Sequence, residues 1–244
     1  MTVLLRVEGL THSFRQPDGT SRVILDHLDL TLNRGEVVCL LGASGSGKTT
    51  LLRILAGLDT ASGGRIDSAL QRPGPRIGYL SQNDHLLPWR SALGNSALGL
   101  ELTGWHKKAA QAKAREALAA VGLAAFADHA PWQLSGGMQQ RVLLARLYAL
   151  EADLLLLDEP MSNLDILARH DLSLLVRTYT RARKAATLVV THSVEEACFL
   201  ADRVLFLTRP PARILREILL PEGGNEAENL QRVTQALWQA LEAT

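Results

Sequence analysis

The residues Gly42-Ala43-Ser44-Gly45-Ser46-Gly47-Lys48-Thr49-Thr50 combine residue types that bind phosphate. The glycines let successive backbone N–H groups point into one concavity, and a helix that begins there adds the positive end of its dipole. The Lys48 ammonium can pair with the β- and γ-phosphates of a nucleotide, and the Thr49 hydroxyl can ligate Mg²⁺. The alternative interpretation is a glycine-rich turn that binds nothing.

The flanking residues favour phosphate binding. The apolar run Val37–Leu41 before the loop is typical of a buried strand, and residues 51–56 after it are typical of a helix. Strand, glycine-rich turn and helix are the context in which the pattern G-x-x-x-x-G-K-[ST] holds a phosphate.

Two carboxylates, Asp158 and Glu159, follow the unbroken apolar run 154–157. A run this short fits a central parallel strand that is buried on both faces. We expect this strand to lie beside the strand that feeds the phosphate loop. Asp158 would then be placed for Mg²⁺ or its water shell, and Glu159 for the attacking water. An exposed acidic turn is the alternative.

A second helix start with anion-binding character lies at Ser135, Gly136 and Gly137. Ser135 is a favourable N-cap, and the two glycines leave backbone N–H groups uncovered. The alternative is a simple capped helix.

The order of the other elements predicts an α/β fold. An antiparallel pair of strands, joined by a turn at 16–20, precedes the phosphate loop, and a helical region then separates it from a resumed β/α alternation. Ser193 and Glu196 have the spacing of a reciprocal capping box. The expected strands are 3–7, 23–32, 37–41, 76–81, 154–158, 187–191, 203–207 and 213–218, and the helical segments fall within 92–150, 164–184 and 193–201.

Composition restricts the function classes. The chain has 244 residues and a net charge of +1, so no general polyanion-binding surface is indicated and we expect no nucleic-acid partner. Cys39 and Cys198 lie far apart in apolar contexts, which predicts buried free thiols in a reducing compartment. The first residues lack the apolar core of a signal peptide, and no apolar run reaches 18 residues, so we expect no membrane span.

The stretch Leu134–Arg141 resembles the signature sequence of ABC-transporter ATPases, and the resemblance extends over about residues 3–218. It implies a phosphate-loop NTPase fold with a mostly parallel core sheet, an N-terminal antiparallel β subdomain and a helical signature subdomain at about 88–150. We expect residues 1–218 to form the ATPase domain and residues 219–244 a helical tail.

The resemblance also implies a site for ATP and Mg²⁺. It implies catalytic roles for Glu159, His192, Lys48 and Gln82, with Gln82 sensing and His192 contacting the γ-phosphate. It implies metal contacts for Thr49, Gln82 and Asp158. The implied nucleotide-binding residues are Phe14, Gly42, Ala43, Ser44, Gly45, Ser46, Gly47, Lys48, Thr49, Thr50, Gln82, Ser135, Gly136, Gly137 and Asp158.

In this family two chains form a head-to-tail dimer, and the signature of each covers the γ-phosphate held by the other. Residues 162–165 match the loop that crosses between subunits. Phe14 is the nearby aromatic residue that could stack on adenine, or it could belong to the core.

Residues 84–90 and 97–104 resemble the corresponding segments of nitrate-, sulfonate- and taurine-type importers. Riboflavin- and pyrimidine-precursor importers share much of this sequence pattern. The resemblance implies a peripheral subunit on the cytoplasmic face of the membrane. Its partners would be an integral-membrane permease and, indirectly, an extracytoplasmic solute-binding protein. Leu86, Leu87 and Trp89 would line the permease groove, or would be core under a loop.

Two other functions fit parts of the pattern: a soluble ABC ATPase that acts on DNA or ribosomes, and an assembly subunit that does not hydrolyse ATP. The absence of an inserted coiled coil argues against the first, and Glu159 with His192 argues against the second. The tail, with Leu230, Val233, Leu237 and Leu241 on one helical face, either packs on its own domain or contacts a partner.

Overall fold

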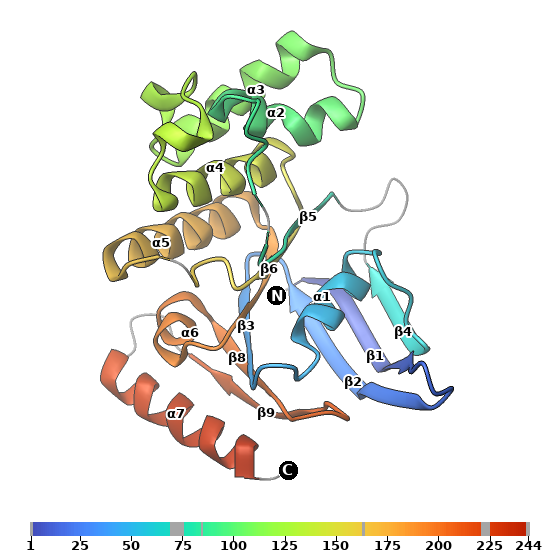
Figure 1. The fold of residues 1–244 in the computed structure, drawn as a ribbon. Coiled ribbons are helices and arrows are strands. Elements are labelled where there is room, and N and C mark those ends of the chain that lie inside the picture. The colour runs from blue at the N-terminus through green and yellow to red at the C-terminus, as the bar shows by residue number, and fades with distance from the viewer. Residues whose placement is uncertain (1, 69–75, 84, 163, 221–224, 243–244) are drawn as a thin grey trace.

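The computed structural model describes residues 2–68, 76–83, 85–162, 164–220 and 225–242, which form an α/β fold with two sheets (Figure 1). The larger sheet has the strand order β5-β6-β7-β3-β8-β9, and all its neighbours are parallel except β9, which is antiparallel to β8. In chain order these strands are β3 (Val37–Gly42), β5 (Ile77–Leu80), β6 (Leu154–Asp158), β7 (Ala186–Thr191), β8 (Arg203–Leu207) and β9 (Ile214–Leu219).

The burial of the four inner strands accounts for their largely apolar sequences. Every residue of β3, β6, β7 and β8 is buried. A parallel strand that is covered on both faces has no solvent side, so its sequence reads as a continuous apolar run. The predicted buried strands are therefore confirmed.

The expected position of β6 is wrong. It does not lie beside β3, because β7 lies between them and pairs with both. Asp158 is level with Val190, while Leu41 is level with Thr191, so β6 and β3 still end at the same edge of the sheet. Two strand spacings, about 10 Å, separate them.

The smaller sheet is antiparallel, as expected for the N-terminal part of the chain. Its order is β2-β1-β4, formed by β1 (Val3–Arg15), β2 (Ser21–Asn33) and β4 (Gly63–Ser68). β1 is longer than expected and runs to Arg15, because Phe14 and Arg15 continue the pairing with β2 up to the turn. The predicted turn at 16–20 is confirmed, with a hydrogen bond of 2.8 Å from the Gln16 N–H to the Thr20 carbonyl.

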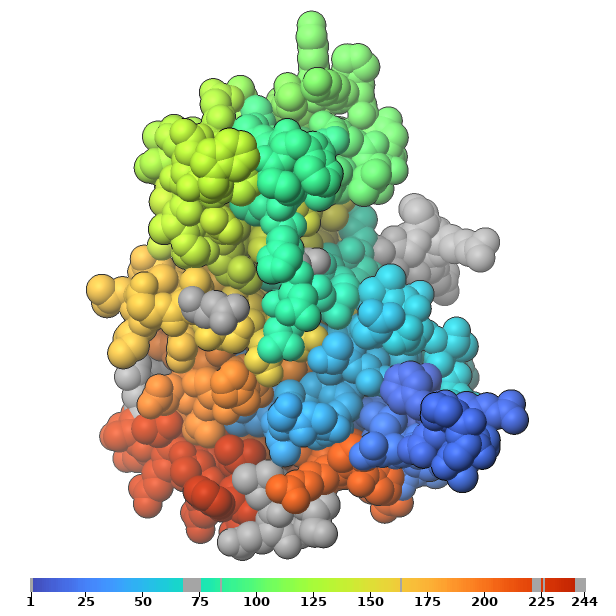
Figure 2. Space-filling view, in the orientation of Figure 1, coloured from blue at the N-terminus to red at the C-terminus, as the bar shows by residue number. Residues whose placement is uncertain are grey.

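Three helices form a layer at one end of the molecule, green in Figures 1 and 2, with contacts between each pair. They are α2 (Ala92–Leu102), α3 (Lys107–Ala120) and α4 (Gly136–Ala149). Short 3₁₀ turns at Ala124–Phe126 and Pro131–Gln133 connect α3 to α4. The helices α1 (Lys48–Leu55), α5 (Ile166–Arg183) and α6 (Val194–Leu200) follow β3, β6 and β7 respectively. Within the described residues, no helix is long and apolar enough to cross a bilayer.

The tail forms α7 (Glu226–Glu242), which packs on its own chain at the end opposite the helical layer (Figure 1). Its contacts are with α6, β8 and β9, and Val233 and Ala236 are buried. Leu230 is at the edge of this contact, and the side chain of Leu241 is outside the described residues. The predicted boundary at residue 218 falls inside β9, and the division into domains stays a prediction.

Both cysteines are free thiols, and Cys39 is fully buried in β3 as expected. Cys198 on α6 is only partly buried, which corrects the expectation for that residue.

Candidate nucleotide-binding site

The phosphate loop has the backbone that its glycines predict. Gly42 ends β3, and Gly47 is the N-cap of α1 with a left-handed φ of 94°. A Cβ at Gly47 would lie 2.9 Å from Ile24 Cγ2, and a Cβ at Gly42 would lie 2.9 Å from Ser46 Oγ. Because contacts this short force a neighbour to move, both positions require glycine.

The Lys48 side chain turns back over the loop. Its Nζ donates hydrogen bonds of 2.9 Å to the Gly42 carbonyl and 2.8 Å to the Ala43 carbonyl, and the residue is 6% exposed. Burial lowers the pKa of this ammonium below its ordinary value, while the nearby carboxylates of Glu159 and Asp158 act to raise it. The cation therefore has loop carbonyls and acidic neighbours to offset its desolvation, but no carboxylate bonded directly to it among the described residues.

A cavity of about 620 Å³ opens over this loop. We call it the phosphate-loop cavity; it is lined by Phe14, Ile24, Ser44, Gly45, Ser46, Gly47, Lys48, Thr49, Thr50, Gln82, Glu159 and His192. The Ser46 hydroxyl is buried and has no hydrogen-bond partner among the described residues. An unpartnered buried donor in a concave loop is costly unless a ligand accepts its bond, so the loop fits an anion such as a nucleotide phosphate.

Asp158 and Thr49 join the acidic strand to the phosphate loop across the intervening β7. The Thr49 hydroxyl donates a hydrogen bond of 2.7 Å to Asp158 Oδ2. Burial is the main cause that raises the pKa of Asp158, and the bond from Thr49 partly opposes it. A carboxylate and a hydroxyl oxygen in contact are the donor types that Mg²⁺ prefers, so this pair fits the expected metal site.

Three side chains from three elements meet at one oxygen of Glu159. Gln82 Nε2, after β5, donates a hydrogen bond of 3.0 Å to Glu159 Oε2, and His192 Nδ1, after β7, lies 3.3 Å from the same oxygen. Glu159 itself has a left-handed φ of 48°, and its N–H bonds to the Val190 carbonyl at 2.9 Å. The fold therefore gathers Gln82, Glu159 and His192, as the sequence predicted, on the wall of the phosphate-loop cavity.

Phe14 reaches the same cavity from the smaller sheet. Its side chain is 47% exposed, and its ring meets that of His12 edge to face at a centroid distance of 4.7 Å. A half-exposed ring on the wall of this cavity does not belong to the core, and its stacking on adenine stays a prediction.

Ser135, Gly136 and Gly137 do not line the phosphate-loop cavity. Ser135 caps α4 by accepting a hydrogen bond of 3.3 Å from the Met138 N–H, and Gly136 lies on a separate cavity of about 160 Å³ that Gln82 and Glu159 also line. Ser135 and Gly136 are exposed. Within one chain, this second helix start therefore stays available for another molecule.

Sequence reasoning missed the use of Thr191 and Glu196. Ser193 accepts the expected bond of 3.1 Å from the Glu196 N–H, but the Glu196 carboxylate accepts from the Thr191 hydroxyl at 2.8 Å and makes no bond to the Ser193 N–H. The capping box is thus half formed, which corrects the expectation. A threonine just before His192 and a glutamate one helical turn later were the available signal.

The residues expected at a permease groove separate into two environments. Leu86 is buried in the core, as the alternative interpretation had it, whereas Trp89 is 76% exposed and lines a surface pocket beside α2. In the segment 84–90 residue 84 lies outside the described residues, and so does residue 163 in the segment 162–165.

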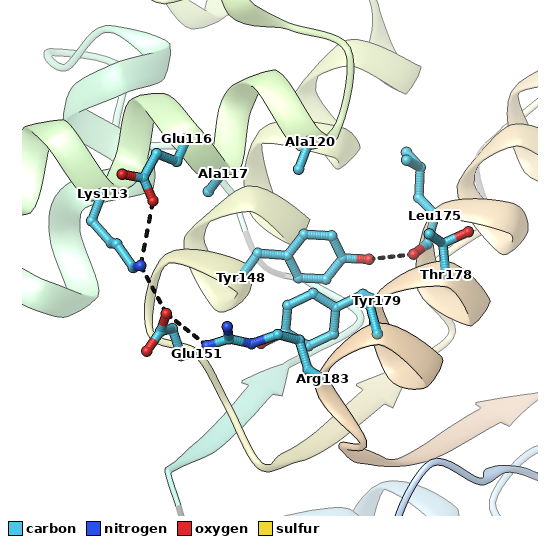
Figure 3. Close-up of a pocket in the computed structure, with 11 residues that line it drawn as sticks. Lys113, Glu116, Ala117, Ala120, Tyr148, Glu151, Leu175, Thr178, Tyr179 and Arg183 are labelled. Carbon is cyan, nitrogen blue, oxygen red and sulfur yellow. Dashed lines mark hydrogen bonds and ion pairs between the residues drawn. The ribbon is translucent and has the colours of Figure 1, made fainter.

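A further pocket, of about 270 Å³, lies between α3, α4 and α5 (Figure 3). We call it the tyrosine pocket, because the rings of Tyr148 and Tyr179 stack in it at a centroid distance of 3.8 Å. The Tyr148 hydroxyl donates to the Leu175 carbonyl at 2.9 Å, and Glu151 forms ion pairs with Lys113 at 2.8 Å and Arg183 at 2.6 Å. It holds none of the predicted site residues.

Comparison with known proteins agrees with this geometry. The family model "ABC transporter" matches residues 25–162. The chain is 43% identical over 217 residues to the "Taurine import ATP-binding protein TauB" of Pseudomonas aeruginosa, and the match covers 88% of this chain and 82% of that protein.

Two solved dimeric structures of the bacterial ABC transporter cassette MJ0796, one in a post-hydrolysis state bound to ADP and Pi, are similar in fold. Each has a TM-score of 0.77 and 28% identity, with 89% of this chain and 99% of that chain covered. With the phosphate loop, the acidic strand end and the signature helix in family order, this chain belongs to the ABC-transporter ATPases, among the ATP-binding subunits of the taurine and sulfonate type.

Proposed function

We propose that this chain hydrolyses MgATP in the phosphate-loop cavity and thereby drives a separate permease that imports a small solute, a sulfonate such as taurine. One observation carries the proposal. Glu159 shares one oxygen with Gln82 and His192 on the wall of the cavity that the phosphate loop also lines. A carboxylate held in this way can accept a proton from a water molecule beside a bound γ-phosphate.

The described contacts suggest a role for each side chain. Lys48, the loop N–H groups and the Ser46 hydroxyl bind the phosphates, and Phe14 stacks on adenine. Thr49, Asp158 and the amide oxygen of Gln82 would hold Mg²⁺, which when bound neutralises charge on the β- and γ-phosphates. Glu159 takes the proton of the attacking water as the bond to the γ-phosphorus forms and the bond to the ADP oxygen breaks. His192 contacts the γ-phosphate and keeps Glu159 oriented.

The complete site is proposed to need a second copy of the chain. Ser135 and Gly136 are exposed at the start of α4, Gly137 is partly buried, and none of the three lines the phosphate-loop cavity of its own chain. Backbone N–H groups at a helix start bind anions, so the second copy can supply them to the γ-phosphate. The related cassette MJ0796 forms a dimer, which supports this arrangement.

The permease is proposed to dock near the segment that follows Gln82. The exposed Trp89, beside the ion pair of Arg90 and Glu101 at 2.6 Å, supplies an amphipathic contact there. Through this permease the chain would lie at the cytoplasmic face of the membrane, with an extracytoplasmic binding protein delivering the solute. The taurine importers among its relatives support a sulfonate as that solute.

Replacing Glu159 with glutamine tests the hydrolysis step. Because the amide cannot accept the proton, we expect phosphate release to fall at least about 100-fold, while ATP binding is kept and a dimer accumulates. Phosphate release and size-exclusion chromatography with ATP measure these effects. Wild-type turnover in Glu159→Gln would contradict the assignment.

The import role needs its own measurement. The chain is to be reconstituted with its permease and binding protein in vesicles, and uptake of radiolabelled taurine followed with and without ATP. Hydrolysis without ATP-dependent uptake of taurine or another sulfonate would leave an ATPase and refute the proposed cargo.

A further inference from the structure

Glu196 is a buried carboxylate outside the phosphate-loop cavity. It lies in the first turn of α6, is 6% exposed, and accepts a hydrogen bond of 2.8 Å from the Thr191 hydroxyl at its Oε2. Its other oxygen, Oε1, is buried and has no hydrogen-bond partner in the described part of the chain. A buried carboxyl group with an unpartnered oxygen destabilises the fold, so packing does not account for this residue.

The contacts of Glu196 enclose the segment that carries His192. The Thr191 hydroxyl that donates to Glu196 also accepts a hydrogen bond of 3.1 Å from the Ser193 N–H. The Ser193 hydroxyl in turn accepts one of 3.1 Å from the Glu196 N–H. We call these three bonds the Thr191–Glu196 relay. It fixes the residues on both sides of His192, whose Nδ1 lies 3.3 Å from Glu159 Oε2.

Helix capping does not require the relay. Ser193 caps α6 by itself, and a reciprocal box would use the Glu196 side chain on the Ser193 N–H. Here the Thr191 hydroxyl lies between the Glu196 carboxylate and the Ser193 N–H and bonds to both. Glu196 therefore holds the end of β7 instead of the first N–H of the helix. The consequence is a fixed position for the backbone of His192.

Charged groups from two other elements face this carboxylate. Burial is the main cause that raises the pKa of Glu196, and Glu159 adds to it, while the bond from Thr191 and the charges of Arg169 and His192 lower it. Arg169 on α5 donates from Nη2 to the Leu164 carbonyl at 3.1 Å, and its Nε is also buried without a hydrogen-bond partner among the described residues. The guanidinium thus supplies a counter-charge from the helix that follows segment 162–165.

We infer that Glu196 is a positioning residue of the ATPase, which acts through the Thr191 hydroxyl to hold His192 against Glu159. This inference rests on the roles proposed above for His192 and Glu159. It assigns to Glu196 an effect on turnover and none on nucleotide affinity, because no atom of Glu196 lines the phosphate-loop cavity.

The test compares kcat and KM for phosphate release in Glu196→Ala, Thr191→Val and the double variant. Thr191→Val removes the hydroxyl and keeps the branched shape of the side chain. We expect each single change to lower kcat about 10-fold with KM within about twofold, as for outer partners of catalytic groups. Because both act through the same bond, the double variant should be no slower than the slower single variant.

Two further variants separate positioning from folding. Thr191→Ser keeps the hydroxyl and should restore kcat to within about twofold of wild type, which a purely structural role of Thr191 would not predict. Glu195→Ala is the matched control, since Glu195 is the exposed glutamate next to Glu196 in the same turn, and it should leave kcat unchanged. If Glu196→Ala does not fold, Thr191→Val against Thr191→Ser tests the same bond.

The outcomes distinguish this inference from the proposed site. Wild-type kcat in Glu196→Ala, or multiplied losses in the double variant, would overturn the inference. A loss of rate in His192→Ala together with wild-type kcat in Glu196→Ala would overturn it and leave the site assignment intact. Wild-type kcat in His192→Ala would instead refute the site assignment itself.

Discussion

The phosphate-loop cavity and the tyrosine pocket both hold a lysine, a glutamate and an aromatic ring, but their polar groups are engaged in different ways. In the tyrosine pocket Glu151 forms ion pairs with Lys113 and Arg183 (Figure 3). From outside the pocket Arg76 adds a third ion pair to Glu151 at 3.3 Å. In the phosphate-loop cavity Lys48 bonds only carbonyl oxygens among the described residues.

This difference indicates that the tyrosine pocket has a structural role, whereas the phosphate-loop cavity is suited to binding an anion. The charged side chains of the tyrosine pocket are already paired with one another, so they are not available to a charged ligand. These pairs and the stacked rings connect α3, α4 and α5. A lysine held by neutral carbonyls keeps its charge for an incoming anion, and the unpartnered Ser46 hydroxyl adds a donor. The two regions also differ in size, with about 620 Å³ for the phosphate-loop cavity and about 270 Å³ for the tyrosine pocket.

The lysines of the two regions give the largest expected contrast. Lys48→Ala should weaken ATP binding about 100-fold, because it removes charge-assisted hydrogen bonds to the phosphates. Titration with a fluorescent ATP analogue measures the affinity. Lys113→Ala is the matched control and should bind ATP as wild type does, so equal affinities in both variants would break the comparison.

The aromatic rings give a smaller contrast. Phe14→Ala should weaken ATP binding about fivefold, which is the loss expected for one stacking contact, whereas Phe14→Tyr keeps the ring and should bind normally. Tyr148→Phe, in the tyrosine pocket, keeps its stacking partner and should leave affinity unchanged. Isothermal titration of all three decides the point, and full affinity in Phe14→Ala would exclude the stacking role.

Glu151 of the tyrosine pocket should affect the stability of the fold and not ATP turnover. Contact with Lys113, followed by that with Arg183, lowers the pKa of Glu151 from 4.5 to about 2. Its ion pairs therefore stabilise the fold above pH 4.5, and the contribution is lost as the pH falls toward 2. Because these side chains are partly exposed, Glu151→Gln should cost only about 1 kcal/mol in the free energy of unfolding at pH 7.

Urea denaturation at pH 7 and pH 4 measures this prediction. The difference between wild type and Glu151→Gln should shrink at the lower pH, since the unfolded wild-type chain then takes up protons at Glu151. A difference that grows on acidification would show that the ion pairs do not account for the stability. ATP turnover at pH 7 should be the same in both chains.

The sequence predicted the phosphate-loop region well because its signals are local. Apolar runs buried on both faces define β3, β6, β7 and β8, and the glycines define the turn that follows β3. The carboxylates Asp158 and Glu159 could be placed from the end of a buried strand, whereas Gln82 and His192 were assigned only through the family resemblance.

The order of the strands in the sheet and the hydrogen-bond partner of Glu196 could not be predicted, because neither depends on local sequence alone. No residue near Leu154–Leu157 records that β7 lies between β6 and β3, since strand pairing is set by the packing of helices from elsewhere in the chain. Glu196 likewise had two acceptable donors, the Ser193 N–H and the Thr191 hydroxyl. The choice between them depended on how the end of β7 meets α6, which spacing alone does not determine.

The left-handed backbone of Glu159 has a consequence for how such a chain can change over generations. A side chain with a Cβ is disfavoured at a φ of 48° by about 1 kcal/mol, and glycine or asparagine would relieve this cost. Glu159 shares this backbone cost with His27, Glu151 and Lys184, and substitution that is filtered only for folding would favour its replacement by glycine. If Glu159 is the catalytic base proposed above, a chain with glycine at this position would be more stable and catalytically idle, so stability and turnover would favour different residues here.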